Sequence, residues 1–591
     1  MLKPGNKLKI TGSSEVRKIP RVLFVTSGVD EGAGYISEGV LVAVQTFSMH
    51  GNFVWLDNRD VLMKPKILSE YSVMILPTSM GYNDGDRKYS LTFLSDYEME
   101  NIKEWVKGGG ILIAEENIGR NHIDGKDRVD ARGELNSGNW KLSELFGIEM
   151  KEIDLNGFSI EETPDNVNKI WNGIVKEKIT EDEWVLIPSE VISDKVKTFA
   201  EWKNDDEKYP AILVNDYGKG KAYLLTSTYI LHPSNAGGYS SIEQIEKFYN
   251  FVLNPDNIRK ESGYEINPWP DGHSSAFCLS FNPEGNSDQF NRVINFVNNK
   301  NIPATFFIDS ELNTEQLNIL KENKNIKLQS GFYSNTDLSY ANYSQIVMEL
   351  NMNEQHFDRD FNGLKFPFGK PNFWGLIYAD EKEYVYESSI SVDHLSGFEG
   401  SVFPYNIPVS QNSYYKTLDM LEISPAGNKD ENYFGKSLTE KDYIDEDQRT
   451  DGQLFNKYLF DFYEFAVQKY NGLMVYAGSP QYTGFSENTI LPLINLTDSL
   501  ITKNCWITSL DEVADFRNKL KVLSVEVSEI GNEVNFKINL PKDIEIRGFT
   551  FKLNSKPESI NSGSRHILKE INGIYYLTCD VKDADSIDLI F

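Results

Sequence analysis

The sequence predicts an α/β multidomain protein that combines an open parallel sheet, a (β/α) barrel and a small antiparallel β-sandwich. The length of 591 residues suggests about three or four domains of ordinary size. Over most of the chain, apolar strands alternate with amphipathic helices, which is typical of parallel α/β sheets. Beyond residue 518, apolar and polar residues alternate between turns, which is typical of antiparallel strands.

The open parallel sheet is expected in residues 20–256, after a polar tail over residues 1–19. Short apolar runs indicate its buried strands: "RVLFVTSG", "NFVWLD", "YSVMILPTS" and "ILIAEEN". The spacing of apolar residues predicts a helix over about 36–50, and a second helix opens with the capping-box pair Ser95 and Glu98. The stretch "YPAILVNDYGKGKAYLLTS" is predicted to form a hairpin near the end of this domain.

These stretches resemble the flavodoxin-like, class I glutamine-amidotransferase-like domains attached to carbohydrate enzymes. The resemblance implies a cysteine nucleophile after the third strand, but here that strand continues into "AEENIGRN" and the first cysteine is Cys278. We therefore expect no thiol chemistry in this domain, and either a retained pocket or a structural role. Ligands of such sheets bind at the carboxyl ends of the strands. The groups available there are Ser27, Glu31, Glu115, Glu116 and Asn117.

A stretch rich in proline, glycine and asparagine, "NPDNIRKESGYEINPWPDG", marks the start of a second domain, expected over residues 257–518. Strands such as "SAFCLSF", "IPATFFID" and "LMVYAGS" alternate there with helices expected over 344–361 and 454–472. This repetition over about 250 residues predicts a (β/α) barrel. Residues 519–591 are expected to form the β-sandwich, with a turn at Gly531.

The charge balance limits the classes of partner. The chain has 88 acidic and 59 basic residues and a net charge of -29, so nucleic-acid backbones and anionic lipid surfaces would repel it. Its three cysteines are too few and too far apart for a disulfide framework or a zinc knuckle. No apolar run reaches the roughly 18 residues that span a bilayer. The start of the chain as given lacks the apolar region of a signal peptide. We expect neither a nucleic-acid partner nor membrane insertion.

Six motifs of the barrel region occur in a characteristic order: "AFCLSFNPEG", "IPATFFI", "SGFYSNTDLS", "LKFPFGKPN", "LMVYAGSPQYTGF" and "CWITSLDEVADF". In this order they resemble the NodB-type polysaccharide deacetylases over about residues 272–518. The resemblance implies a polysaccharide or oligosaccharide partner and a location at the cell envelope or outside the cell. In that family a divalent metal, held by one aspartate and two histidines, polarises the N-acetyl carbonyl and binds water.

The metal ligands of that family are replaced at the matching positions of this chain. The metal aspartate falls on Pro283, or on Glu284 if the loop is longer by one residue. The two metal histidines fall on Gly331 and Asn335. One remaining carboxylate cannot chelate a metal, so we expect no metal and no cofactor in the barrel.

The acid and base residues are replaced as well. The resemblance places the carboxylate base at Asn282, which takes no proton at neutral pH, and the orienting arginine at Lys365, which loses the bidentate fork. The late histidine that protonates the leaving amine falls on Ser479. Together these replacements predict a deacetylase site without deacetylase activity.

The residues left at the predicted carboxyl ends of the barrel strands are polar and aromatic, a mixture that also binds sugars. The candidate ligand-binding residues are Asn282, Glu284, Tyr333, Asn335, Lys365, Trp374, Asp393, His394, Tyr476 and Tyr482. Such a pocket either holds a glycan or is a relic filled by its own side chains and water.

The sequence therefore predicts a carbohydrate-associated pseudo-deacetylase that binds or scaffolds a polysaccharide. One alternative is an active glycan hydrolase of altered mechanism, because two facing carboxylates cleave glycosides without a metal. Glu284 and Asp393 are the candidates for that pair. A second alternative is a purely structural assembly component.

Overall fold

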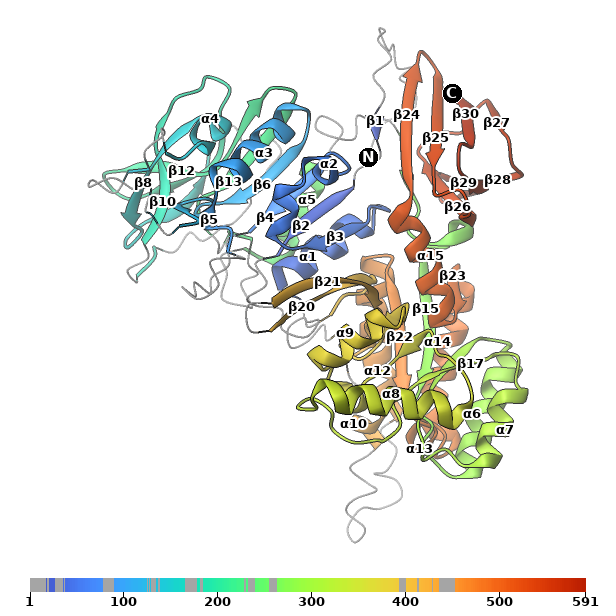
Figure 1. The fold of residues 1–591 in the computed structure, drawn as a ribbon. Helices are drawn as coiled ribbons and strands as arrows, with labels where there is room; N and C mark the ends of the chain where they lie inside the picture. The colour runs from blue at the N-terminus through green and yellow to red at the C-terminus, as the bar shows by residue number, and fades with distance from the viewer. Residues whose placement is uncertain are drawn as a thin grey trace.

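The chain folds as a mixed α/β protein with several sheets (Figure 1). The computed structural model describes residues 17–18, 21–26, 36, 38–77, 90–124, 126, 128, 134–135, 139–164, 178–180, 184–227, 230–231, 240–253, 263–392, 400–411, 414–427, 429–434 and 452–591. Four residues predicted from the sequence, Ser27, Glu31, Asp393 and His394, lie outside the described residues.

The first large sheet has eight strands and contains the predicted parallel strands of the N-terminal region. In spatial order the strands are β3 (Val54–Asp57), β2 (Val22–Val25), β4 (Val73–Leu76), β6 (Ile111–Glu115), β13 (Gly220–Leu225), β12 (Lys208–Tyr217), β11 (Lys197–Lys203) and β9 (Ser159–Glu162). The first five run parallel, and the last three continue the sheet with antiparallel pairings. Smaller elements of this region are η1 (Arg59–Met63), α2 (Pro65–Leu68), β5 (Phe93–Leu94), β7 (Asn121–His122), β8 (Ile148–Asp154) and β10 (Trp184–Val191).

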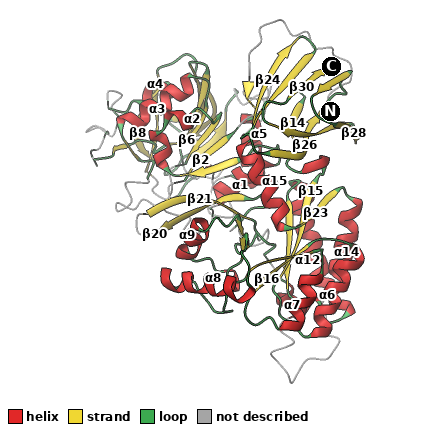
Figure 2. Ribbon diagram, turned by 45° about the vertical axis from the view of Figure 1, so that its right-hand side comes forward, coloured by secondary structure: helices red, strands yellow, loops and turns green. Residues whose placement is uncertain are grey.

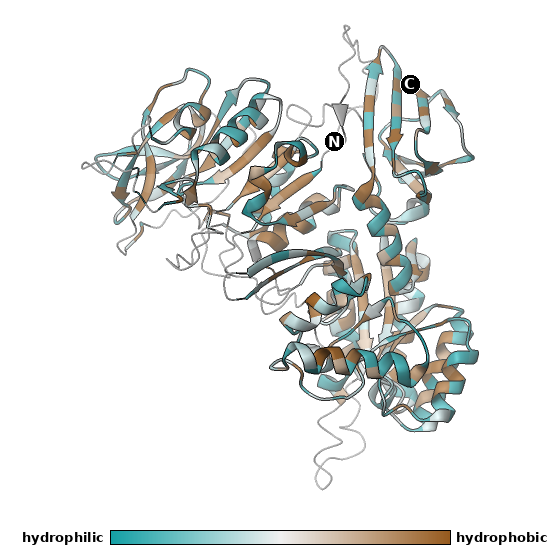
Figure 3. Ribbon diagram, in the orientation of Figure 1, coloured by the Kyte–Doolittle hydropathy of each residue, from teal (hydrophilic) through white to brown (hydrophobic). Residues whose placement is uncertain are grey.

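Helices cover both faces of this sheet because successive strand residues point to opposite sides. Val22 points into the core shared with α1 (Glu38–Ser48) and α5 (Ile242–Val252). Its neighbour Leu23 points into the opposite core, shared with α3 (Asp96–Lys107) and α4 (Leu142–Phe146). The apolar strands and the polar outer faces of the helices are visible in Figure 3.

The second large sheet forms a partial barrel. Its strands lie in the order β20 (Tyr405–Gln411), β21 (Tyr414–Glu422), β19 (Tyr386–Glu387), β18 (Gly363–Leu364), β17 (Ile326–Ser330), β16 (Ala304–Ile308), β15 (Ser275–Phe281) and β22 (Leu473–Gly478). Strand β23 (Cys505–Thr508) also pairs with β15, and all pairings are parallel except that of β20 with β21. Main-chain hydrogen bonds draw the two ends of the sheet together, from Ala426 N–H to the Val475 carbonyl (2.9 Å) and from Leu473 N–H to the Val402 carbonyl (2.7 Å).

Helices surround the strands of this barrel (Figure 2). They are α6 (Ser287–Lys300), α7 (Thr314–Glu322), α8 (Tyr343–Phe357), α9 (Phe373–Glu381), α10 (Asp430–Phe434), α12 (Gly452–Tyr463), α13 (Pro480–Thr483), α14 (Glu487–Thr502) and α15 (Leu510–Val522). Two 3-10 turns, η5 (Pro270–Gly272) and η6 (Pro367–Gly369), and a π-helical turn, η8 (Glu464–Lys469), complete it. Among the described residues, none of the helices is both long and apolar enough to cross a lipid bilayer.

The C-terminal region consists of two antiparallel sheets with a shared core. One sheet has the order β1 (Arg17–Lys18), β24 (Ser524–Ile530), β25 (Glu533–Asn539), β30 (Ser586–Ile590) and β27 (Ser559–Ser562). The other has the order β14 (Tyr264–Ile266), β26 (Glu545–Leu553), β29 (Ile574–Lys582) and β28 (His566–Ile571). The rings of Phe536 and Phe551 stack between the sheets with centroids 4.3 Å apart.

Several elements differ in extent from the sequence prediction. Helix α8 ends at Phe357 rather than at residue 361, because Asp358 adopts a left-handed conformation with φ 49° that ends the helical hydrogen bonds. Strands β1 and β14 come from outside residues 519–591 but pair with strands of the sandwich. Helix α15 runs across residue 518, so the division of the chain into domains stays a prediction.

The first sheet and the barrel meet around one buried arginine, Arg517 of α15. Its guanidinium lies 5.6 Å from the ring centroid of Phe53, 5.8 Å from that of Trp269 and 5.7 Å from that of Phe403. Burial among these rings lowers the pKa of Arg517 to about 10. Cation–π contacts therefore join the edge of the first sheet, the barrel and α15.

A side chain of the barrel also completes the edge of the first sheet. Asn406 of β20 accepts a hydrogen bond from Leu56 N–H (3.2 Å) and donates one to the Leu56 carbonyl (3.0 Å). Leu56 belongs to the outermost strand β3, so the carboxamide takes the place of a neighbouring strand. The hairpin β20–β21 thus lies directly against the first sheet (Figures 1 and 2).

Candidate functional site

The candidate site lies where the carboxyl ends of the parallel barrel strands converge. Asn282 directly follows β15, Lys365 directly follows β18, and Ser479 directly follows β22. The loops are held together by main-chain hydrogen bonds, from Asn282 N–H to the Gly478 carbonyl (3.0 Å) and from Gln481 N–H to the Glu284 carbonyl (2.9 Å). The parallel topology thus brings together residues that are up to about 200 positions apart in the sequence.

Lys365 is the central residue of this group. Its side chain is buried, and its ammonium donates a hydrogen bond to Oδ1 of Asn282 (3.1 Å) and lies 5.6 Å from the ring centroid of Phe307. Burial, followed by repulsion from Lys429, lowers the pKa of Lys365 to about 7, while the carboxyl of Glu284 opposes that change. Near neutral pH, Lys365 therefore exists in both charged and neutral forms.

Three carboxyl groups of this region have raised pKa values, in each case chiefly because of burial. The pKa of Glu284 is raised, although Lys365 opposes the change. The pKa of Asp309, at the end of β16, rises to about 6, and the charge of Glu284 adds to the rise. The pKa of Asp430 also rises to about 6, although it accepts hydrogen bonds that favour its ionised form. Groups with a pKa of about 6, such as Asp309 and Asp430, are suited to general acid and base chemistry.

Asp430 forms hydrogen bonds with Ser479, the position of the late histidine, and with Thr483. Its Oδ2 accepts hydrogen bonds from Ser479 N–H (2.9 Å), Thr483 N–H (3.1 Å) and the Thr483 hydroxyl (2.6 Å). The predicted residue Tyr476 is buried beside them, with its hydroxyl 2.5 Å from that of Thr483. Ser479 and Tyr476 are thus part of the packed wall of the site.

A buried pair of glutamates lies on two neighbouring strands of the barrel. Glu387 of β19 and Glu422 of β21 are register partners in neighbouring parallel strands, and both are fully buried. Burial raises the pKa of both groups, and the two carboxyls contact each other. Two ionised carboxylates have no proton to share, so the contact requires a proton on one of them. Glu422 also accepts a hydrogen bond from Ile390 N–H (3.1 Å).

The position of the first metal histidine has little space for a side chain. A Cβ placed on Gly331 would lie 3.0 Å from the carbonyl oxygen of Phe307. The following residue, Phe332, is fully buried in a left-handed conformation (φ 66°), and the amide of Asn353 donates to its carbonyl. Asn335 is half-buried. Within the ranges that the structure describes, no three His, Cys, Asp or Glu side chains are grouped so that they could hold a metal ion.

The other predicted residues of the barrel lie at varied distances from this group. Tyr482 is half-buried on α13, where the charges of Glu431 and Glu284 raise its pKa after burial itself. The ring of Tyr333 lies edge-on to that of His356, with centroids 5.7 Å apart. Trp374 belongs to a separate group of rings on the barrel surface. The group of residues around Lys365 is therefore smaller than the predicted set, and a larger share of its side chains is charged.

Sequence reasoning missed Asp309, Glu387, Glu422 and Asp430. A usable signal was present for the first three, since each carboxylate stands at the end of a buried strand: "ATFFID", "YE" and "MLE". Charged residues are rarely fully buried unless they are paired or functional. Asp430 follows an irregular segment, so its place beside β22 could not be read from strand pattern.

Three of the predicted residues of the first sheet lie at the end of β6, and two of them are buried. Glu115 and Glu116 are 1% and 3% exposed, and the amide of Asn117 donates to Glu116 at 2.6 Å. The charge of Glu115 contributes to a raised pKa at Tyr249, after burial itself. A ligand role for these three residues stays a prediction.

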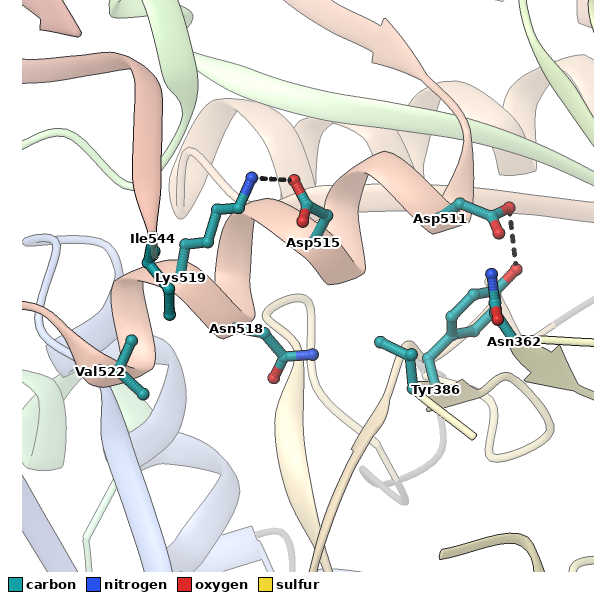
Figure 4. Close-up of a pocket in the computed structure, with 9 residues that line it drawn as sticks. Asn362, Tyr386, Asp511, Asp515, Asn518, Lys519, Val522 and Ile544 are labelled. Carbon is teal, nitrogen blue, oxygen red and sulfur yellow. Dashed lines mark hydrogen bonds and ion pairs between the residues drawn. The ribbon is translucent and has the colours of Figure 1, made fainter. Parts of the chain in front are cut away.

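A cavity of about 380 Å³ lies away from the Lys365 group, where α15 faces β19 and the sandwich (Figure 4). Tyr386 points toward it, and its strand neighbour Glu387 points to the opposite face of the sheet, because strand residues alternate. The Tyr386 hydroxyl donates to Asp511 at 3.3 Å, and Lys519 forms an ion pair with Asp515 at 2.8 Å. None of the residues predicted to bind ligand lines this cavity.

Comparison with known proteins gives one family match and several distant structures. A family described as the beta-galactosidase trimerisation domain matches residues 57–258. No curated protein matches the sequence of the chain.

Three similar solved structures belong to carbohydrate-related proteins. A "probable polysaccharide deacetylase" from Pseudomonas aeruginosa PAO1 is 13% identical, with 43% of this chain and 93% of that chain covered and a TM-score of 0.33. A mutant of a CE4 family pseudoenzyme with restored enzymatic activity is 10% identical over 41% of this chain and 68% of that chain, with a TM-score of 0.27. A cold-adapted beta-galactosidase from Rahnella sp. R3 is 16% identical over 43% of this chain and 34% of that chain, with a TM-score of 0.27. The assignment of function below therefore rests on the geometry of the chain itself.

Proposed function

We propose that this chain is a carbohydrate-associated pseudo-deacetylase whose barrel mouth binds a glycan without metal-dependent deacetylation. The observation that carries the proposal is the hydrogen bond from Lys365 to Asn282. These two residues stand where the resemblance places the orienting arginine and the catalytic base, and the amide of Asn282 at the base position cannot accept a proton from water. The close main chain at Gly331 supports the same conclusion, because a Cβ there would lie only 3.0 Å from the carbonyl oxygen of Phe307.

Binding and deacetylation can be measured separately on the full chain. Calorimetry with N-acetylated and unacetylated oligosaccharides should detect binding, and Lys365→Met should weaken it, whereas the exposed Lys370→Met should not. A free-amine assay on the N-acetylated oligosaccharide should detect no acetyl release. Absence of binding to every oligosaccharide, or metal-dependent acetyl release, would contradict the proposal.

An active hydrolase of altered mechanism is the alternative that one observation favours. Burial raises the pKa of Glu284, as a general acid of a glycosidase requires. Its proposed partner, Asp393, lies outside the described residues. Release of reducing ends from a polysaccharide, abolished by Glu284→Gln, would establish this alternative, and its absence would remove it.

A structural role is supported by the similarity of residues 57–258 to the family of beta-galactosidase trimerisation domains. We propose that this region assembles copies of the chain. Light scattering of the purified chain should then give a mass three times that of one chain of 67.4 kDa. A monomeric mass at micromolar concentration would refute the assembly role and leave the proposal for the barrel mouth untouched.

A further inference from the structure

A continuous strip of aromatic rings runs over the outer surface of the barrel. It consists of Tyr378, Tyr343, Trp374, Phe373 and Tyr414, and we call it the aromatic strip. Successive ring centroids lie 5.7, 5.9, 5.0 and 5.7 Å apart, each pair in an edge-to-face arrangement. The rings come from α8, α9 and β21, and α9 lies between the other two in Figures 1 and 2.

Three of these rings are exposed to solvent, and their neighbours hold them in place. Tyr343, Trp374 and Tyr414 are 38%, 39% and 46% exposed, whereas Phe373 is 8% exposed and supports two of them from below. The hydroxyl of Tyr343 donates to Glu381 at 3.0 Å, which fixes the orientation of the ring. The edge-to-face contacts between neighbouring rings further restrict their orientations. The strip is therefore a prearranged apolar surface, and ligand binding would order few side chains.

Two lysines beside the aromatic strip are already paired with carboxylates of the protein. Lys416 forms an ion pair with Asp380 at 2.7 Å, and Lys382 forms one with Glu354. Glu381 accepts the hydroxyl of Tyr343. Glu381 keeps its negative charge, because its partner is a neutral hydroxyl, and the net charge of -29 likewise repels polyanions. The complementary partner is an uncharged molecule with both apolar faces and hydroxyl groups.

We propose that the aromatic strip binds a neutral polysaccharide chain along the outside of the barrel, separately from the barrel mouth. Pyranose rings present C–H groups on their flat faces and hydroxyls at their edges, so the faces pack on exposed aromatic rings. The edges then meet the carboxylates and ammonium groups beside the strip. The inference rests on the proposed carbohydrate function but assigns a different binding surface.

Affinity electrophoresis of the full chain tests this proposal, because an acidic protein migrates readily through a native gel. The probes are a soluble β-galactan and hydroxyethyl cellulose, with polygalacturonate as an anionic comparison. The neutral polymers should retard the wild-type chain, and Trp374→Ala and Tyr414→Ala should each weaken retardation by about tenfold, equal to ~1.4 kcal/mol. Tyr343→Phe, which keeps the ring, should retain most of the binding.

A matched control is Tyr340→Ala, which removes a ring that is 97% exposed and lies three residues before the strip. It should leave retardation unchanged. If Trp374→Ala and Tyr414→Ala bind both neutral polymers as the wild type does, the proposal is overturned. It is also overturned if these variants change the mass of the assembly instead, because the strip would then be an interface between copies.

Lys365→Met separates this proposal from that for the barrel mouth. Retardation that Trp374→Ala abolishes and Lys365→Met leaves intact supports the aromatic strip even if the mouth binds nothing. The opposite pattern overturns the strip and leaves the mouth as the binding site. Circular dichroism of each variant confirms that the fold is retained.

Discussion

Substitution of Lys365 by methionine should stabilise the barrel near pH 6. The fall of the Lys365 pKa from 10.5 to about 7 means that burying its charge opposes folding. At 1.36 kcal/mol for each pH unit, the opposing free energy is roughly 5 kcal/mol when both the folded and the unfolded forms are protonated. Methionine has a similar length and no charge, so it removes this cost.

The net gain is smaller than that upper bound. Methionine also loses the hydrogen bond to Asn282, and the carboxyl of Glu284 loses its neighbouring cation. Replacement of buried charges by apolar side chains commonly gains about 1–4 kcal/mol. For a domain of about 250 residues, 1 kcal/mol shifts Tm by roughly 2–4 °C, so we expect a rise of several degrees at pH 6.

The pH dependence gives the sharper test. Between pH 7 and 10.5 the unfolded lysine holds a proton that the folded one has released, so the stability of the wild type rises with pH in that window. The advantage of Lys365→Met should therefore shrink from pH 7 toward pH 10. Scanning fluorimetry across this range measures it, with Lys370→Met as the exposed control. A lower Tm for Lys365→Met at pH 6, or an advantage that is independent of pH, would refute the reasoning.

Three further outcomes are expected. Glu422→Gln should raise Tm more at pH 8 than at pH 4. The pKa of Glu422 is raised in the folded protein, so ionisation of this group above its unfolded pKa opposes folding, whereas the glutamine amide stays neutral and can donate to Glu387. An equal shift of Tm at both pH values would contradict this. Asn406→Leu should cost about 1–3 kcal/mol by leaving the main-chain groups of Leu56 without partners, and an unchanged thermal transition would rule that out. Elemental analysis of the purified chain should find less than one zinc or cobalt per molecule, and one stoichiometric ion released by Glu284→Gln would show the expectation to be wrong.

Local patterns in the sequence predicted local structure well. The capping box of Ser95 and Glu98 is present in both directions, and the strand predicted from "SAFCLSF" is β15 with the same bounds. Such features depend on residues within one turn or one strand, so they are encoded where they form. Strands β1 and β14 have two and three residues, too few to show alternation, and only their partners define them.

The candidate site was harder to predict because its geometry comes from distant segments. The sequence indicated Asn282 and Lys365, and the structure joins them by a hydrogen bond. The pairing of Glu387 with Glu422 depends on the return of the hairpin β20–β21 to β19, which no local pattern records. Trp374 was expected at the mouth, but its position at the start of α9 places its ring against Tyr343 on the surface.

The order of synthesis determines when the hydrogen bonds of the Asn406 carboxamide can form. Its partner Leu56 leaves the ribosome 350 residues earlier. At about 5–20 residues per second, the edge of β3 waits roughly 20–70 seconds for that amide. During this interval the edge presents open main-chain groups to neighbouring nascent chains. Translation pauses before residue 406 would prolong this exposure, and we expect them to lower the share of chains in which the first sheet reaches its native state.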